Sequence, residues 1–102
     1  MAAGRIKKQP DEILDYALDF SGRLETGETI TLTSCMSVNL ETGADSSAAL
    51  ISTSPAPAVS GQAVVFWLEN GADGEHHKVT VIVTSSGGRD LEDDLDVFIV
   101  EE

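Results

Sequence analysis

Short segments of this sequence alternate between apolar and polar residues, and this alternation is the feature that most constrains the fold. It is cleanest in Leu14 to Phe20, where every second residue is apolar and the residues between are small or acidic. Successive side chains of a β-strand point to opposite faces, so the pattern predicts a strand with one buried face. A helix capped by Asp11 is the alternative, but helical spacing would leave Leu14 and Leu18 off its apolar side. We therefore favour the strand.

Further segments of this kind follow along the chain, separated by stretches rich in Gly, Pro, Asn and Ser that are typical of turns. The expected strands cover residues 14–20, 29–38, 46–54, 63–68, 78–84 and 95–100. No segment carries a helical pattern of any length. The spacing is typical of an all-β protein, and we predict a single immunoglobulin-like antiparallel β-sandwich of about six to seven strands.

Two of the expected strands indicate which side chains are buried in the core and which face solvent. Residues 63–68, AVVFWL, are apolar at every position, which favours a central strand with Trp67 as the largest buried side chain. Residues 29–38 are Thr-rich and alternate, which predicts one wet face. Cys35 falls on that wetter face, unless an irregularity near Met36 reverses the order.

Length and charge limit the function classes. The chain has 102 residues, enough for one domain with one core, and its net charge is −12. A surface this acidic repels phosphate groups, so we expect neither nucleic acid nor an anionic membrane as a partner. Cys35 is the only cysteine, so no internal disulfide can form, which fits assembly in a reducing cytoplasm.

The first ten residues are small, polar and basic and end at Pro10. They lack the apolar stretch of a secretory signal. We predict a flexible basic N-terminal arm over residues 1–10 and the sandwich domain over residues 11–102. The arm is either plain terminal disorder or a segment that docks on a partner.

A dense acidic run from Asp90 to Asp96 is the other unusual feature. It is interpreted as a solvated edge strand, since charges on an edge discourage sheet-to-sheet association. A docking surface for basic residues is an alternative, and a calcium site is a weaker one because the spacing of a calcium loop is missing. The candidate partner-binding residues, from the arm and the run together, are Arg5, Ile6, Lys7, Lys8, Asp90, Glu92, Asp93 and Asp94.

The sequence predicts no enzyme, no metal site and no cofactor. His76 and His77 are adjacent, so on a strand they point to opposite faces, and we expect both to be solvated. No serine lies in a GxSxG motif or has a histidine placed to suggest a base. No basic residue neighbours Cys35 in sequence to activate its thiol.

Two stretches, PDEILDYALDFSGRL and GETITLTSCMSV, resemble the start of a family of small bacteriophage virion proteins, the fibre-tail adaptor or Gp77-like structural proteins. The stretch from Ala63 to Val100 is similar to the rest of the family pattern, including its Thr-x-x-Gly-Arg turn at Thr84 to Arg89. One departure is that the family has a tryptophan where this chain has Ser34-Cys35-Met36. The resemblance covers residues 10–100.

The resemblance implies an immunoglobulin-like sandwich built into the virion, without catalytic residues. We therefore expect an adaptor that links tail or neck components to fibres, assembled in the bacterial host cytoplasm and present in multiple copies around a symmetric ring. Its expected partners are other virion proteins. The alternative is an immunoglobulin-like module of a bacterial surface protein that binds protein or carbohydrate.

Overall fold

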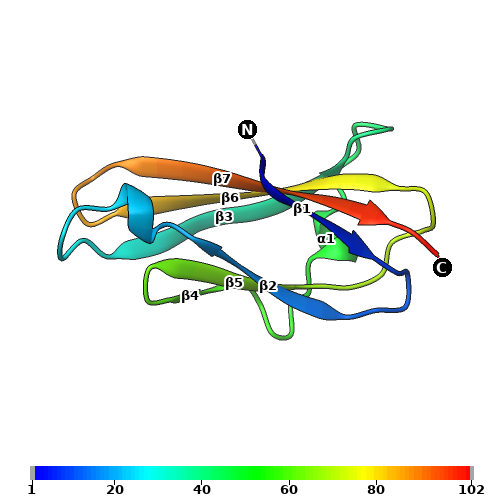
Figure 1. Ribbon diagram of the computed structural model, residues 1–102, viewed down its shortest axis with the longest axis horizontal. Helices are drawn as coiled ribbons and strands as arrows, with labels where there is room; N and C mark the ends of the chain where they lie inside the picture. Colours follow the sequence, from blue (N-terminus) through cyan, green and yellow to red (C-terminus); the bar gives the residue numbers. More distant parts are fainter. Residues whose placement is uncertain (1, 102) are drawn as a thin grey trace.

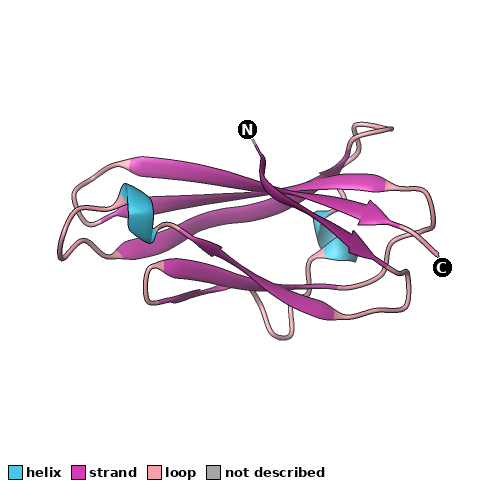
Figure 2. Ribbon diagram, viewed as in Figure 1, coloured by secondary structure: helices cyan, strands magenta, loops and turns pink. Residues whose placement is uncertain are grey.

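The computed structural model of the protein describes residues 2–101 and contains two β-sheets that pack against each other (Figure 1). The molecule is elongated, 43 × 24 × 20 Å. Its strands are β1 (Ala2–Lys8), β2 (Leu14–Asp19), β3 (Ile30–Asn39), β4 (Ala58–Ser60), β5 (Ala63–Leu68), β6 (His76–Ser85) and β7 (Asp90–Ile99). Two short helical segments, η1 (Ser21–Arg23) and α1 (Ser47–Leu50), lie towards opposite ends of the sandwich (Figure 2).

One sheet has the strand order β1-β7-β6-β3 and the other has the order β2-β5-β4. Neighbouring strands are antiparallel except β1 and β7, which run parallel. The predicted all-β sandwich is therefore confirmed, and its strand count agrees with the prediction. The expectation of a purely antiparallel sandwich was wrong for the β1–β7 pair.

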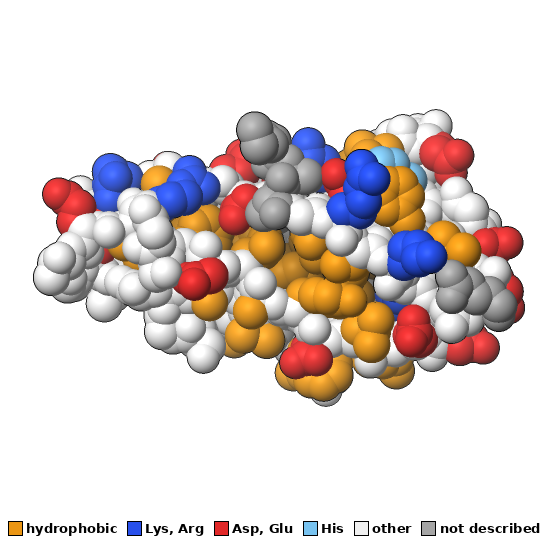
Figure 3. All heavy atoms as spheres, in the orientation of Figure 1, with side chains coloured by type: hydrophobic (Ala, Val, Ile, Leu, Met, Phe, Trp, Pro, Cys, Tyr) orange, Lys and Arg blue, Asp and Glu red, His pale blue; other side chains and the backbone are white. Residues whose placement is uncertain are grey.

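The core lies between the sheets and is mostly aliphatic. Alternate residues of β5 and β6 are buried, so each strand faces the other sheet with one side only. The buried apolar residues are Leu18, Phe20, Ile30, Leu50, Ile51, Val64, Phe66, Leu68, Val79, Val81, Val83, Leu91, Leu95, Val97 and Ile99. In Figure 3, hydrophobic side chains are also visible between the two layers, on the side where β1 and β2 cross the view.

Trp67 is not part of the buried core, contrary to the prediction. It lies on β5 between Phe66 and Leu68, which are completely buried. Because the side chains of a strand alternate, Trp67 faces the opposite side and is only half-buried. The apolar run misled the prediction because both faces of β5 carry apolar residues while only one lines the core.

An irregularity in β3 exchanges its two faces. The register with β6 shifts between Leu32 and Ser34, as in a β-bulge. After the shift, Cys35 packs against the core, whereas Met36 is 49% exposed. The position predicted for Cys35 is reversed, as the sequence analysis allowed for an irregularity in this region.

The weak strand expected over residues 46–54 is replaced by α1 and an isolated bridge between Ile51 and Leu68. The adjacent residues Leu50 and Ile51 are both buried. Two neighbouring side chains of a regular strand cannot both face the core, so a short helical turn replaces the strand here.

The N-terminal arm is also a correction. Residues 2–8 form β1 and pair with β7 from Asp94 to Ile99, so this part of the chain is a strand of the sheet and not a loose arm. Met1 lies outside the described residues. Local sequence could not show this pairing, because the partner strand lies at the far end of the sequence. The sandwich therefore includes residues on both sides of the boundary expected after Pro10.

Candidate interaction surface

The two groups of predicted contact residues lie side by side. Parallel pairing of β1 with β7 places Arg5 next to Asp96 and Lys7 next to Phe98. Basic and acidic segments from opposite ends of the sequence thus meet on one sheet. The structure thus brings together, within one chain, the two groups of residues that the sequence offers as candidate contacts.

Three of the predicted basic-segment residues remain at least partly accessible. Arg5 and Lys7 are exposed, and Ile6 between them is half-buried and packs against the core. The guanidinium carbon of Arg5 lies 5.3 Å from the centre of the Phe98 ring, within cation–π distance. His76 stacks on the same ring, with 4.0 Å between ring centres.

Lys8 has no access to a partner, because its side chain is enclosed and only 1% of the residue is exposed. Its Nζ donates hydrogen bonds to the backbone oxygens of Asn70 at 2.6 Å, Gln9 at 2.9 Å and Pro10 at 3.2 Å. An ammonium group has three hydrogens to donate, so this set satisfies it. Burial lowers the pKa of Lys8, while the charge of Glu12 opposes the change. Lys8 fastens the end of β1 to the loop after β5.

The acidic run belongs to an internal strand, since β7 lies between β1 and β6. The solvated-edge interpretation therefore does not apply to its second half. Asp90 and Glu92 are exposed and Asp93 is half-buried, whereas only 3% of Asp94 is exposed. Asp94 Oδ2 lies 3.5 Å from Nζ of Lys78, and its Oδ1 has no hydrogen-bond partner among the described residues.

Two basic side chains make contacts near the start of β7, which extends beyond β1. Arg23 of η1 donates from Nη1 to the backbone oxygen of Glu92 at 2.7 Å. Arg89 Nη2 lies 2.6 Å from Glu28 Oε1, an ion pair that holds the β6–β7 turn against the loop before β3. Both basic side chains are therefore engaged within the chain.

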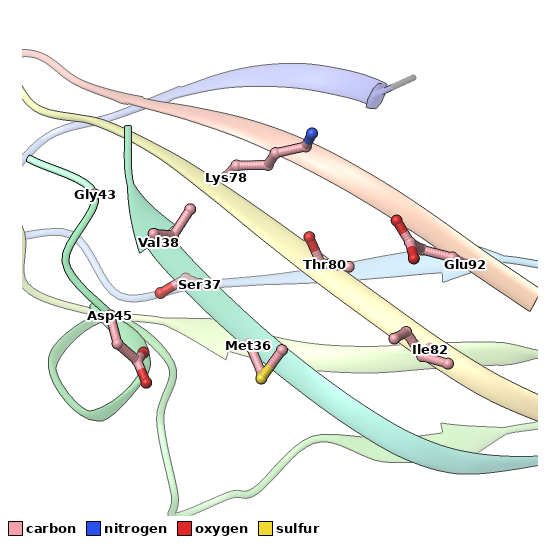
Figure 4. A pocket seen from close by; sticks show the side chains of 9 residues that line it. All are labelled: Met36, Ser37, Val38, Gly43, Asp45, Lys78, Thr80, Ile82 and Glu92. Carbon is pink, nitrogen blue, oxygen red and sulfur yellow. The ribbon is translucent and has the colours of Figure 1, made fainter. Parts of the chain in front are cut away.

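A hollow that sequence reasoning missed lies on the outer face of β3, β6 and β7 (Figure 4). Its volume is about 430 Å³. Its lining residues are Met36, Ser37, Val38, Gly43, Asp45, Lys78, Thr80, Ile82 and Glu92. The signal in the sequence was the apolar pair Met36 and Val38, but their exposure depends on the register shift in β3.

A chain of hydrogen bonds joins the buried His77 to the partly exposed Ser46 and Glu75. Ser46 Oγ lies 2.9 Å from His77 Nδ1, and His77 Nε2 lies 2.9 Å from Glu75 Oε1. His76 and His77 do point to opposite faces, but the prediction that both are solvated was wrong, since His77 is 4% exposed. No local pattern in the sequence indicates this serine–histidine contact, which joins residues far apart in the chain.

The connectivity resembles that of a hydrolase triad, but the surrounding backbone is arranged for support. Acyl transfer needs N–H groups directed at the developing oxyanion. The N–H of Ser46 donates to Ser37 O, and the N–H of Ser47 donates to Asp45 Oδ1. Both groups are used within the fold, so the network fastens the loop after β3 onto β6.

Several ionisable groups are shifted by their surroundings. Backbone N–H groups lower the pKa of Glu75 and Glu28, donated by Ala72 and Glu25 respectively. Burial raises the pKa of the Cys35 thiol to about 11. The thiol is therefore protonated at neutral pH and is a poor nucleophile.

Within residues 2–101, no three His, Cys, Asp or Glu side chains are grouped so that they could hold a metal ion. The helical segments in this range are too short to cross a bilayer.

Comparison with known protein families gives a match that covers most of the sandwich. The family model described as podophage GP4 fiber-tail adaptor protein gp77 matches residues 8–98. A search of curated proteins found no match. The matched range runs from the last residue of β1 into β7, so it includes strands of both sheets. The chain therefore belongs to the family of the podophage GP4 fiber-tail adaptor protein gp77, the family that its sequence resembles.

Proposed function

We propose that this protein is a structural component of a bacteriophage virion that links tail or neck components to fibres through protein–protein contacts. The observation that carries the proposal is the family match over residues 8–98, which covers the sandwich from the end of β1 to β7. An elongated domain, 43 × 24 × 20 Å, with two sheet faces and two ends suits a part that must contact more than one neighbour. The net charge of −12 favours protein partners over nucleic acid.

The strand order supports an immunoglobulin-like arrangement within this proposal. In that fold, two antiparallel sheets share seven strands, and the B, E and D strands lie together in one sheet. Here β2, β5 and β4 take those places, and β7, β6 and β3 take the places of strands G, F and C. β1 is added parallel to β7 at the edge of the second sheet.

We further propose that the protein acts in multiple copies around a symmetric tail or neck, after assembly in the cytoplasm of the bacterial host. Repeated copies would let a modest contact hold a fibre, because linked binding events strengthen one another. The proposal involves no catalysis. The N–H groups beside Ser46 are engaged and the Cys35 thiol is protonated at neutral pH, which supports a structural role.

A deletion of the gene tests the role directly. Particles would be grown in cells that lack the protein and in cells that supply it from a plasmid, then purified and analysed by mass spectrometry and electron microscopy. We expect particles made without the protein to lack fibres, and particles from the complemented cells to carry them. If particles without the protein kept every fibre and tail component, the proposed adaptor function would be wrong.

A further inference from the structure

The outer face of β3 exposes apolar side chains that do not support the core. Met36 is 49% exposed and Leu40, just past the strand, is 45% exposed, with the half-buried Val38 between them. These alternate residues lie on one side of the strand because the register shift turns them outward. Exposed apolar residues that are scattered singly need no explanation, but a contiguous group often marks a contact surface.

Met36 and Val38 of this row form one side of the hollow described above. Ile82 and Thr80 of β6 line it as well, as Figure 4 shows. Two carboxylates stand at its margin: Asp45, from the loop after β3, and Glu92, from β7. Lys78 also lines the hollow, and its Nζ lies 3.5 Å from Asp94 Oδ2. The hollow therefore combines an apolar lining with two carboxylates and one lysine, and that lysine is paired with Asp94 of β7.

The first part of β3 is also open to pairing. From Ser37 onward its free edge is taken up by residues 43–47, through the bridge between Val38 and Asp45 and the hydrogen bonds from Ser46 N to Ser37 O and from Asn39 N to Ala44 O. β3 is the last strand of its sheet, and residues 30–38 contain no charged side chain. Natural edge strands are commonly protected by charges, prolines or short length. β1 and β2 carry charged residues and β4 has three residues, so β3 is the least protected strand edge in the described chain. An extended segment could add to it through backbone hydrogen bonds.

We infer that the hollow and the open edge of β3 before Ser37 together receive an extended segment of another virion protein, with apolar side chains flanked by Lys or Arg. The apolar side chains would lie against Met36 and Val38, and the basic ones would face Asp45 and Glu92. This inference rests on the proposed adaptor function and adds the location and the chemistry of one contact.

A second copy of the chain is poorly suited to this site. Basic side chains of the chain already act within it: Lys8 on backbone oxygens, Arg23 on Glu92 O, Lys78 with Asp94, Arg89 with Glu28 and Arg5 on Phe98. Each copy also carries a net charge of −12, so two copies repel each other. A basic segment of a different protein complements the site better.

The test compares Met36→Glu with Ile13→Glu. Both variants place a carboxylate on an exposed apolar position, because Ile13 is 62% exposed, but Ile13 does not line the hollow. A third variant, Glu92→Lys, reverses a charge at the margin. Thermal unfolding first establishes that each variant folds. Purified proteins are then added to particles made without the chain, and bound protein and recruited fibres are quantified after sedimentation, at low and high salt.

We expect the wild-type protein and Ile13→Glu to bind and to recruit fibres. Met36→Glu should weaken one of these two steps by about tenfold or more, as for a central contact residue. Glu92→Lys and added salt should weaken the same step. If Met36→Glu supported both steps at the wild-type level, the inference would be overturned while the adaptor function stood.

Two further outcomes separate the remaining explanations. If wild-type protein did not bind and the particles made without it already carried fibres, the adaptor function itself would fail. If sedimentation velocity of the purified protein showed a dimer that Met36→Glu abolished, the occupant of the site would be a second copy. That result would overturn the assignment to a different basic protein.

Discussion

Replacing Lys8 with methionine would test whether a buried ammonium group holds β1 in the sheet. Methionine keeps an unbranched chain of similar length, so the packing of the stem changes little. What is lost is the set of hydrogen bonds from Nζ to the backbone oxygens of Asn70, Gln9 and Pro10. The change therefore removes the polar contacts while keeping most of the apolar ones.

The expected loss follows from the three bonds. A hydrogen bond from a charged donor contributes about 1.5–3 kcal/mol. The oxygen of Gln9 keeps a second partner, the N–H of Glu12 at 3.1 Å, so its loss matters less. The bond to Asn70 is the shortest, at 2.6 Å, and joins parts of the chain far apart in sequence. Allowing for the dehydration cost that the ammonium no longer incurs, we expect a loss of about 2–4 kcal/mol in unfolding free energy.

Urea unfolding at pH 7 would measure this loss, with Lys7→Met as the matched control. Lys7 is the exposed neighbour on the same strand, and the contacts of an exposed lysine contribute no more than about 1 kcal/mol, so its replacement should change stability by no more than that. A Lys8→Met protein within the same range of wild type would refute the reasoning.

The pH dependence gives a second check on Lys8. Its folded-state pKa is lowered from 10.5, so in the interval below 10.5 the unfolded chain binds more protons than the folded one. Wild-type stability should therefore gain a contribution from Lys8 as pH rises through this interval. Lys8→Met should lack that contribution. Equal slopes for the two proteins would show that the amine is not dehydrated as its position implies.

Three other predictions concern separate parts of the fold. The pKa of Glu75 is lowered, mainly by the N–H of Ala72, so its contribution to stability is present above the ordinary value of 4.5 and should be lost as pH falls below that value. Urea unfolding measured from pH 6 to pH 3 checks this, and a free energy of unfolding without that loss would contradict it. The pKa of Cys35 is raised to about 11, so the folded protein should react with iodoacetamide at pH 8 roughly a hundred times more slowly than the unfolded protein. Mass spectrometry would follow the reaction, and equal rates would refute the burial of Cys35. Gly71→Ala should destabilise the protein by about 1–3 kcal/mol, because φ of Gly71 is +97° and a Cβ there would lie 2.8 Å from Cδ1 of Ile99. The control is Gly22→Ala, whose Cβ would meet no atom within 4 Å, and calorimetry that found equal effects for the two variants would contradict this.

Local patterns predicted most of the sandwich. The strands from Leu14, from Ala63 and around Val81 follow the alternation in the sequence, because one face of each strand is buried and the other is not. Prediction was wrong where both faces are apolar, as at Trp67, and where a one-residue shift in β3 exchanges inside and outside. Neither effect is visible until the partner strand is known.

The candidate surface was harder to predict because it depends on contacts between distant segments. Arg5 and the acidic run were both recognised, but only the parallel β1–β7 pairing places them on one sheet. Lys8 was grouped with the exposed basic residues, although three backbone oxygens enclose its amine. The hollow beside Met36 and the bond between Ser46 and His77 depend on β3, β6 and their loops packing together, which no local pattern indicates.

The direction of β1 has a mechanical consequence. Because β1 and β7 run parallel, tension between the beginning of β1 and the end of β7 would slide the strands past each other. In that geometry the ladder bonds from Arg5–Asp96 to Lys8–Ile99 share the load, whereas a pair pulled apart from one end opens bond by bond. The bond from Lys8 to Asn70 ties the sheared strand to a loop outside the pair. A sandwich fastened in this way resists a pull applied between the start of β1 and the end of β7.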